Sequence, residues 1–226
     1  MPDATMNVAC LDAQRALPGW YGKLPGAGDF VDRRMPRAIA QSWELWLARG
    51  IASIQESGAQ SFSERYAHAP IWCFAIPAGA GVGAVQFGCL APSFDRVGRR
   101  YPLLVVHVLE LSGFSRDTAS WASASLPAIG ETLAQAIRQA YEPEQFDRAL
   151  AVRMAGALGE GDEAPSPANG WPNLLDYFDP DGATSFWWVS AGERGSSQAR
   201  AHTGALDGAL FSRLFGGDDL SLNVDE

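Results

Sequence analysis

The chain has 226 residues and a formal net charge of −9, with 47% apolar and 19% charged residues, which is the composition of a folded protein and not of a disordered one. A chain of this length buries roughly 70% of the surface that it exposes when unfolded, so it can form a full core without disulfides or metals. The acidic balance argues against nucleic acid and anionic lipid as partners, because both usually require a basic surface.

The sequence contains neither a membrane span nor a secretion signal. No apolar run approaches the ~18 residues of a membrane span. The N-terminus, MPDATMNVACLDAQRALPGW, lacks the basic start and apolar middle of a signal peptide. We therefore expect a cytoplasmic protein without direct membrane insertion.

The three cysteines, Cys10, Cys73 and Cys89, form no CxxC pair. They make neither a disulfide framework nor a zinc pattern, and reduced thiols are the expected state in the cytoplasm. Cys73 and Cys89 lie symmetrically about Gly81. A hairpin that turns at this glycine would place the two side chains opposite each other.

The first third of the chain predicts an arm, a strand and a helix. Residues 1–18 show no sustained periodicity and are expected to form a loosely held arm. WYGKL at 20–24 reads as a strand, and PGAG at 25–28 reads as a tight turn. Pro36 fits the first turn of a helix. The apolar residues of this helix recur on one face and predict that this face is buried: Ile39, Trp43, Trp46, Leu47 and Ile51.

The middle of the chain predicts a hairpin, a central strand and two helices. IWCFAI and AVQFGCL, at 71–76 and 84–90, flank a glycine-rich turn. Residues 103–111 are apolar at odd and even positions alike, which favours the middle of a sheet covered on both faces. An alanine-rich helix is expected from Ser115 or Asp117 towards Tyr141, with a kink or split at Pro127, followed by a helix at 144–158.

The last third predicts a loop, strands, a closing helix and a tail. Residues 159–170 combine turn formers with acids and predict a flexible loop. Strand-like segments follow at 185–190 and near Arg200, then a helix at 206–215 and a mobile acidic tail at 216–226. Because strands and helices alternate, we predict a single-domain α/β sandwich over residues 1–226, with a mixed central β-sheet flanked by helices.

Two segments are more specific than a scaffold requires: GWYGKLPGAGDFVDRRMP at 19–36 and PSFDRVGRRYPL at 92–103. Leu24 and Pro25 follow Lys23, so the first segment lacks the Ser or Thr of a phosphate-binding loop, and its glycines do not have the Rossmann spacing. We interpret these glycines as residues that permit positive backbone dihedrals in a tight turn.

The two segments also concentrate arginine in an acidic chain. Their guanidinium groups offer bidentate contacts to a carboxylate or a phosphate, but the neighbouring aspartates could pair with them inside the molecule. Both interpretations stay open at this point. The candidate recognition or structural residues are Lys23, Asp29, Arg33, Arg34, Asp95, Arg96, Arg99 and Arg100.

No catalytic constellation accompanies these segments. His68, His107 and His202 have no second ligand at metal-binding spacing, and no nucleophile signature occurs. His107 is expected to be a core ring, and DYFDPDG at 176–182 is expected to be a turn and not a calcium loop. We therefore predict no catalytic residues, no metal site and no cofactor. Trp187 and Trp188 must point to opposite faces of one strand, so both faces should be covered.

Both segments, in this order, resemble the signatures of the TagF (ImpM) family of type VI secretion-associated proteins. The W-x-x-W-L of Trp43, Trp46 and Leu47 and the aromatic strand near Trp187 extend the resemblance over most of the chain. The chain is expected to be the form that has the N-terminal domain only, because it is too short for the phosphatase domain that some relatives carry.

The resemblance implies a non-enzymatic, cytoplasmic accessory protein. Such a protein would hold type VI secretion in check after translation by binding a forkhead-associated scaffold protein. A competing hypothesis is an anionic-ligand- or nucleotide-sensing or hydrolytic domain, in which the glycine-rich and DRVGR loops converge on one pocket.

Overall fold

The structure is a computed structural model that describes residues 17–56, 59–159, 174–189 and 199–216. Several predicted features lie outside the described residues: Cys10, most of the arm at 1–18, almost all of the loop at 159–170 and all but the first residue of the tail at 216–226. None of the helices in the described ranges is long and apolar enough to cross a membrane.

The predicted hairpin, the aromatic strand and the helix at 144–158 are confirmed, and they occur in the predicted order. The strand at 30–33 and the helices at 59–68, 111–113 and 174–177 were not predicted. In chain order the elements are β1 (Gly19–Lys23), β2 (Phe30–Arg33), α2 (Arg37–Glu56), α3 (Ala59–His68), β3 (Trp72–Ile76), β4 (Ala84–Ala91), β5 (Leu103–Glu110), η1 (Leu111–Gly113), α4 (Arg116–Arg138), α5 (Pro143–Gly159), α6 (Leu174–Tyr177), β6 (Thr184–Val189), β7 (Ala199–Thr203) and α7 (Gly208–Phe215).

The strands form one seven-stranded sheet in the order β2-β1-β5-β4-β3-β6-β7. The α/β fold with flanking helices is confirmed, but each strand pairing is antiparallel, where a mixed sheet was expected. The helical connections join β2 to β3 and β5 to β6, which are not neighbours in the sheet, so neither connection makes a parallel pair of adjacent strands. The middle strand is β4, and the predicted middle strand, β5, lies beside it.

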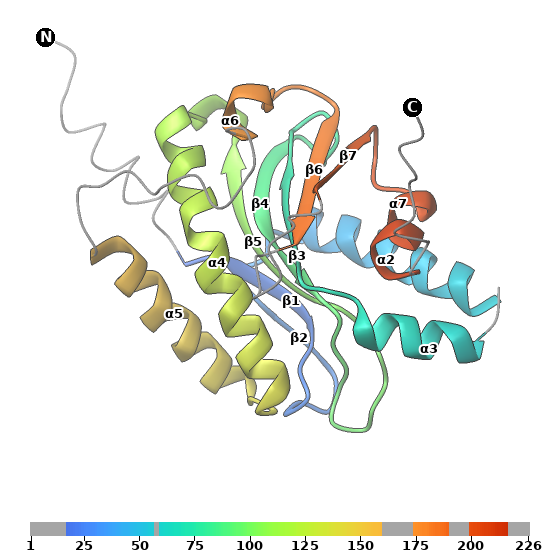
Figure 1. The fold of residues 1–226 in the computed structure, drawn as a ribbon. Coiled ribbons are helices and arrows are strands. Elements are labelled where there is room, and N and C mark those ends of the chain that lie inside the picture. The colour runs from blue at the N-terminus through green and yellow to red at the C-terminus, as the bar shows by residue number, and fades with distance from the viewer. Residues whose placement is uncertain (1–16, 57–58, 160–173, 190–198, 217–226) are drawn as a thin grey trace, which may run out of the picture.

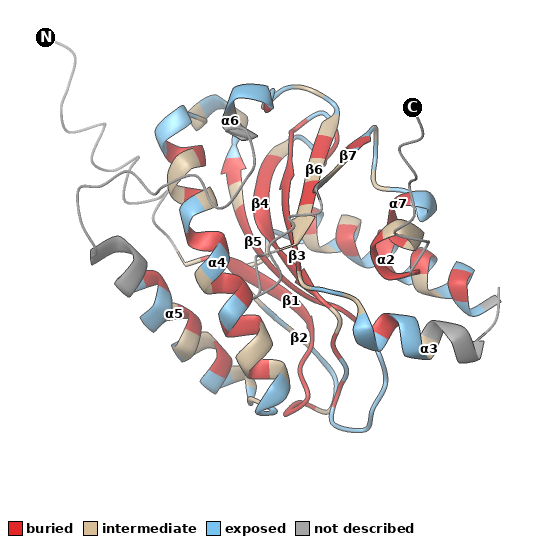
Figure 2. Ribbon diagram, in the orientation of Figure 1, coloured by how far each residue is buried: buried red, intermediate tan, exposed pale blue. Residues whose placement is uncertain are grey.

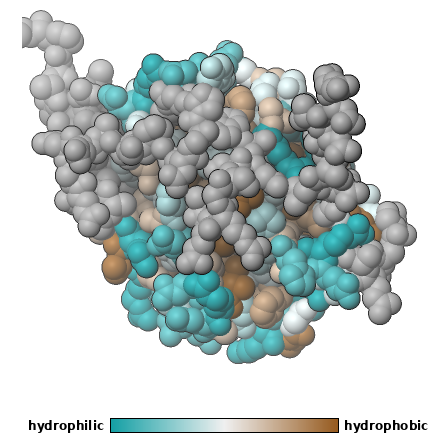
Figure 3. Space-filling view, in the orientation of Figure 1, coloured by the Kyte–Doolittle hydropathy of each residue, from teal (hydrophilic) through white to brown (hydrophobic). Residues whose placement is uncertain are grey.

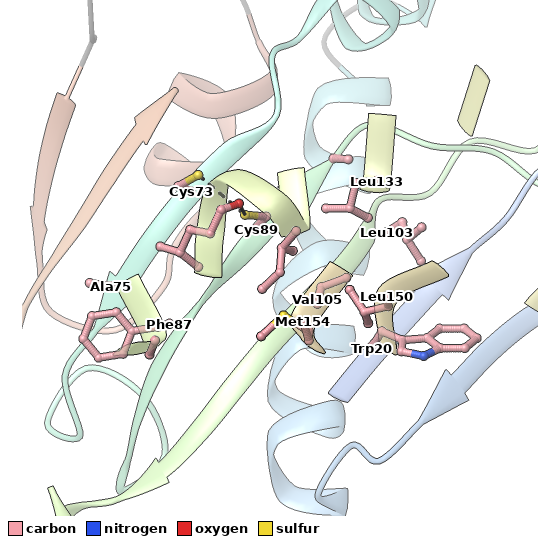
Figure 4. Packing of buried hydrophobic residues seen from close by; sticks show 14 of the residues in the cluster. Trp20, Cys73, Ala75, Phe87, Cys89, Leu103, Val105, Leu133, Leu150 and Met154 are labelled. Carbon is pink, nitrogen blue, oxygen red and sulfur yellow. Dashed lines mark hydrogen bonds between the residues drawn. The ribbon is translucent and has the colours of Figure 1, made fainter. Parts of the chain in front are cut away.

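Helices cover both faces of the sheet (Figure 1). On one face α4 and α5 pack over Trp20, Val105 and their neighbours, some of which Figure 4 shows. On the other face α2 and α7 pack over Phe74 and Trp187. Buried residues therefore run along the whole interior of the sheet (Figure 2), and this explains why β5 is apolar at both odd and even positions.

Helix α4 excludes a split at Pro127, which was one of the two outcomes expected there. Ser115 is the N-cap, and its Oγ accepts a hydrogen bond from the backbone N–H of Thr118 at 3.1 Å. The helix then continues through Pro127 without being split. Leu126 and Ile129 are buried on either side of the proline, so packing on the sheet holds both halves of the helix in place.

Cys73 and Cys89 lie directly opposite each other in β3 and β4, as their symmetry about Gly81 predicted. Their Sγ atoms are 3.5 Å apart, and both side chains are buried beneath α4 (Figure 4). Burial raises the pKa of the Cys89 thiol well above its ordinary value, so the reactive thiolate is disfavoured. The two residues pack as small apolar side chains.

His107 is a core residue, as expected. Its Nε2 lies 3.1 Å from Ser125 Oγ, which itself donates to the carbonyl oxygen of Ala122 at 2.6 Å. The imidazole Nε2–H is therefore the donor to Ser125. Burial lowers the pKa of His107, so the ring is neutral at neutral pH. The Trp121 ring packs against it at a centroid distance of 4.6 Å.

We expect His107 to make the protein less stable in acid. Burial lowers the pKa of His107 from 6.5 to about 4, so between these pH values the unfolded state binds the extra proton. The free energy of unfolding is therefore highest above pH 6.5. It decreases by about 3 kcal/mol as the pH falls from 6.5 towards 4. Urea unfolding at a series of pH values should show this slope in the wild type and in the exposed-site control His68→Gln. His107→Gln should have a flatter profile, and an equal slope in that variant would contradict the prediction.

Candidate functional site

The two signature segments meet at one end of the sheet, where the β1–β2 turn lies beside the β4–β5 loop (Figure 1). Gly22 in β1 pairs with Leu103 in β5. The backbone N–H of Arg96 donates to the carbonyl oxygen of Ala27 at 2.8 Å, and Ser93 Oγ donates to the carbonyl oxygen of Lys23 at 2.7 Å. Backbone and side-chain hydrogen bonds thus hold the two segments together.

Lys23, Asp95 and Arg99 form an ion-paired group that we call the Asp95 cluster. The Asp95 side chain has no exposed surface, and its Oδ2 lies 3.0 Å from Lys23 Nζ and 2.7 Å from Arg99 Nε. Asp95 Oδ1 accepts hydrogen bonds from the backbone N–H groups of Val97 at 3.1 Å and Arg99 at 2.9 Å. Both carboxylate oxygens are therefore occupied, and the cluster fixes the loop from inside.

The electrostatics of Asp95 follow from this geometry. Burial by itself would raise the pKa of the carboxyl group. The Lys23 ammonium, the backbone N–H of Arg99 and the Arg99 guanidinium outweigh this effect and hold the pKa of Asp95 well below its ordinary value of 3.8. Asp95 is therefore ionised throughout the neutral range, and its charge is neutralised within the molecule.

We expect Asp95→Asn to lower stability at neutral pH, because it leaves the Lys23 ammonium buried without its counter-charge. The depressed pKa means that the carboxylate contributes stability above pH 3.8, and that this contribution is lost as the pH falls through the lower pKa of the folded state. The gap between wild type and variant in chemical denaturation should therefore be widest near neutral pH and narrow below about pH 4. A constant gap across this range would contradict the assignment.

Arg33 and Arg34 form a second set of ion pairs, which attaches α5 to β1 and β2. Arg33 Nη2 lies 2.8 Å from Glu144 Oε1, and Arg34 is ion-paired with Asp147. Asp147 Oδ1 also accepts a hydrogen bond from Trp20 Nε1 at 2.8 Å. These arginines therefore have structural partners inside the chain. Sequence reasoning did not find Glu144 and Asp147, because they lie more than a hundred positions away.

The glycines of the PGAG turn are required for a different reason from the one predicted. Neither Gly26 nor Gly28 has a positive φ. A Cβ at Gly26 would collide with the carbonyl oxygen of Tyr141 between α4 and α5, and a Cβ at Gly28 would meet Arg96 Nη2 at 3.1 Å. Close approach of backbone, and not backbone conformation, excludes a side chain at Gly26, whereas at Gly28 the exposed Arg96 side chain would need to shift by only a few tenths of an ångström.

The remaining candidates are exposed. Arg96 and Arg100 have no side-chain partner among the residues that the structure describes. Asp29 Oδ1 accepts a hydrogen bond from the backbone N–H of Phe30 at 2.8 Å, so its one recorded contact is local. The structure thus divides the candidates into internally paired residues, one aspartate with a local contact, and two cations without a side-chain partner in the described ranges.

Three apolar residues that sequence reasoning did not single out accompany these cations. Val97 is 70% exposed, Phe30 46% and Phe94 41%. In Figure 3 hydrophobic and hydrophilic atoms lie side by side at the lower rim, where the β4–β5 loop projects in Figure 1. The sequence feature that could have revealed these residues is a large apolar side chain inside an otherwise polar turn. We call this set the signature-loop face: Phe30, Phe94, Arg96, Val97 and Arg100.

The signature-loop face has the composition of a protein-binding surface. Aromatic residues and arginine are enriched in interfaces. A loop that is already held in place by ion pairs loses less conformational entropy when it binds a partner. Within the described ranges, no group of three or more His, Cys, Asp or Glu side chains is arranged as metal ligands are. The fold and the loops define an α/β protein whose two signature loops meet at one end of a seven-stranded antiparallel sheet.

Comparison with known families identifies this class more closely. The TagF N-terminal domain family, described as type VI secretion system-associated, matches residues 19–152. The chain belongs to this family, as its two signature segments predicted. It is also similar to the crystal structure of PA0076 from Pseudomonas aeruginosa PAO1, with 25% sequence identity, a TM-score of 0.65 and coverage of 92% of this chain and 98% of that chain. A comparison with curated protein sequences gives no match.

Proposed function

We propose that this protein is a non-enzymatic, cytoplasmic accessory protein that restrains type VI secretion after translation. In this proposal it binds the forkhead-associated scaffold protein of the secretion system through the signature-loop face. The family match supports the association with type VI secretion. The observation that carries the binding surface is the exposure of Arg96, Val97 and Arg100 in one loop, whose only acid, Asp95, is buried and paired with Lys23 and Arg99.

The competing hypothesis of ligand sensing or hydrolysis has less support. It needs the glycine-rich loop and the arginines of the DRVGR loop, Arg96 and Arg99, to converge on a bound anion in one pocket. Lys23 is nearly buried and pairs with Asp95, while Arg99 donates to Asp95 and to the carbonyl oxygen of Gly28 at 2.8 Å. A thermal-shift screen with nucleotides and anionic metabolites tests this hypothesis, and clear stabilisation at millimolar ligand would revive it.

Co-purification with the scaffold protein of the same secretion system tests the proposal. We expect the wild-type chain to bind, and Arg96→Glu and Val97→Asp each to weaken binding by about tenfold or more, as central interface residues do. Val152→Asp is the matched apolar control, because Val152 on α5 is 71% exposed and Val97 is 70% exposed. Arg49→Glu on α2 is the matched charge control.

The possible outcomes distinguish a wrong partner from a wrong binding surface. If the wild-type chain does not bind the scaffold, the proposed partner is wrong. If both loop variants bind as well as the two controls do, the surface is wrong. Secretion assays in cells that carry the same variants report on repression, and loss of binding should accompany higher secretion.

A further inference from the structure

Arg96 is placed as a recognition residue would be. Its backbone N–H is fixed by the carbonyl oxygen of Ala27, and its guanidinium lies against Gly28, where a Cβ would come within 3.1 Å of Nη2. Its side chain has no hydrogen-bond or ion-pair partner in the described part of the chain. The group is therefore held at its base while its donors stay available.

The Arg99 guanidinium reaches the same glycine. Its Nε donates to Asp95 and its Nη2 donates to the carbonyl oxygen of Gly28, so these two nitrogens are engaged. Gly28 thus brings the guanidinium groups of Arg96 and Arg99 to one small area of surface. Because the Arg99 donors are engaged, Arg96 is the group of this pair that can offer parallel N–H donors to the two oxygens of a carboxylate.

The local charge supports an acidic ligand. Residues 92–102 carry three arginines and one aspartate, a local net charge of +2 within a chain of net charge −9. The one acid of this loop, Asp95, is buried and paired. The exposed Asp29 beside Gly28 also contributes, and the net charge over residues 28–29 and 92–102 is +1. The apolar side chains of Phe94 and Val97 lie in the same loop and are exposed.

We propose that the signature-loop face recognises an acidic segment of a partner protein. An Asp or Glu carboxylate of the partner accepts hydrogen bonds from Arg96, and Arg100 adds a second positive charge. An apolar side chain of the same segment packs against Val97 and Phe94. This inference rests on the proposed function, since it assumes a protein partner at this face, and it adds the chemistry by which that partner is bound.

Titration of the isotope-labelled full chain with short synthetic peptides, followed by NMR, tests this chemistry. One peptide alternates Glu and Phe, the second alternates Lys and Phe, and the third alternates Glu and Ser. We expect the Glu/Phe peptide to shift the signals of the β4–β5 loop and Gly28 with a saturable profile. The Glu/Ser peptide should bind more weakly at the same signals, and the Lys/Phe peptide should leave them unchanged. Added salt should weaken the Glu/Phe binding.

Arg96→Gln should weaken Glu/Phe binding by about tenfold, because it removes the charged fork. Arg49→Gln is the control and should bind as the wild type does. Arg96 has no side-chain partner among the described residues, so the variant should keep its fold, and circular dichroism checks this. Equal binding by Arg96→Gln and wild type would overturn the inference, as would equal binding of the Lys/Phe peptide.

Inorganic phosphate at matched ionic strength is the remaining probe. If it produces the same shifts and displaces the peptide, the site binds small anions and the inference is overturned. Scaffold binding that is insensitive to Arg96→Gln would overturn this chemistry but leave the proposed function standing. Arg96-dependent peptide binding without scaffold binding would support the chemistry and reject the proposed partner.

Discussion

Gly22→Ala is expected to destabilise the protein by at least about 4 kcal/mol or to prevent folding. Gly22 has a φ of +137°, which residues with a side chain rarely adopt. A Cβ at this position would also collide with the carbonyl oxygen of Pro102 on the neighbouring segment. The nearest atoms are all backbone atoms of Pro102 and Leu103, so no side chain can move to relieve the clash.

Gly98→Ala is the control that separates the two causes. Gly98 also has a positive φ, +85°, but a Cβ there would meet nothing within 4 Å. Gly98→Ala should lower the free energy of unfolding only by the cost of placing alanine in this backbone conformation, about 1–2 kcal/mol. Urea denaturation followed by circular dichroism measures both. Similar losses in the two variants would mean that the contact between β1 and Pro102 is looser than the structure has it.

Trp187→Ala is expected to cost about 3–5 kcal/mol, the range for removing a large aromatic side chain from a core. Trp187 is fully buried between the sheet and α2. Its ring lies 5.1 Å from that of Phe74 and 5.9 Å from that of Trp46, measured between centroids. Its Nε1 donates to Ser185 Oγ at 3.0 Å, and this donor is lost as well.

Trp188→Ala tests the same strand on its other face. Trp188 is half-buried and packs against the core beneath α4, so its truncation should cost less, about 1–2 kcal/mol. Both variants replace a tryptophan by alanine, at adjacent positions of the same strand. If Trp188→Ala proved the more damaging of the two, the assignment of the faces of β6 would be wrong.

These stability effects bear on the proposed docking surface. Gly22 lies where the two signature segments meet, so Gly22→Ala should also disturb the signature-loop face. Trp187 lies in the core on the α2 side of the sheet. Reduced scaffold binding by Trp187→Ala should therefore follow the fraction of unfolded protein, whereas Val97→Asp should weaken binding without changing stability.

Patterns that depend on neighbouring positions were predictable. The period of β6 predicted that Trp187 and Trp188 have opposite faces, and the symmetry about Gly81 predicted the pairing of Cys73 with Cys89. The helical spacing in residues 39–51 predicted the buried face of α2, because a repeat of 3.6 residues is a local property of the chain. The family was predictable for the same reason, since its signatures are continuous segments.

The sequence by itself therefore determined the main elements, their buried faces, the family and the two loops that carry the candidate site. Only the tertiary structure decided the antiparallel strand order, the continuity of α4 through Pro127, and which charged residues are used internally. Lys23 and Asp95 are 72 positions apart, and Arg34 and Asp147 are 113 apart. Such pairings depend on how the sheet brings distant segments together, and no local pattern encodes that distance. Arg96 is thus distinguished from Arg34 by packing and not by residue type.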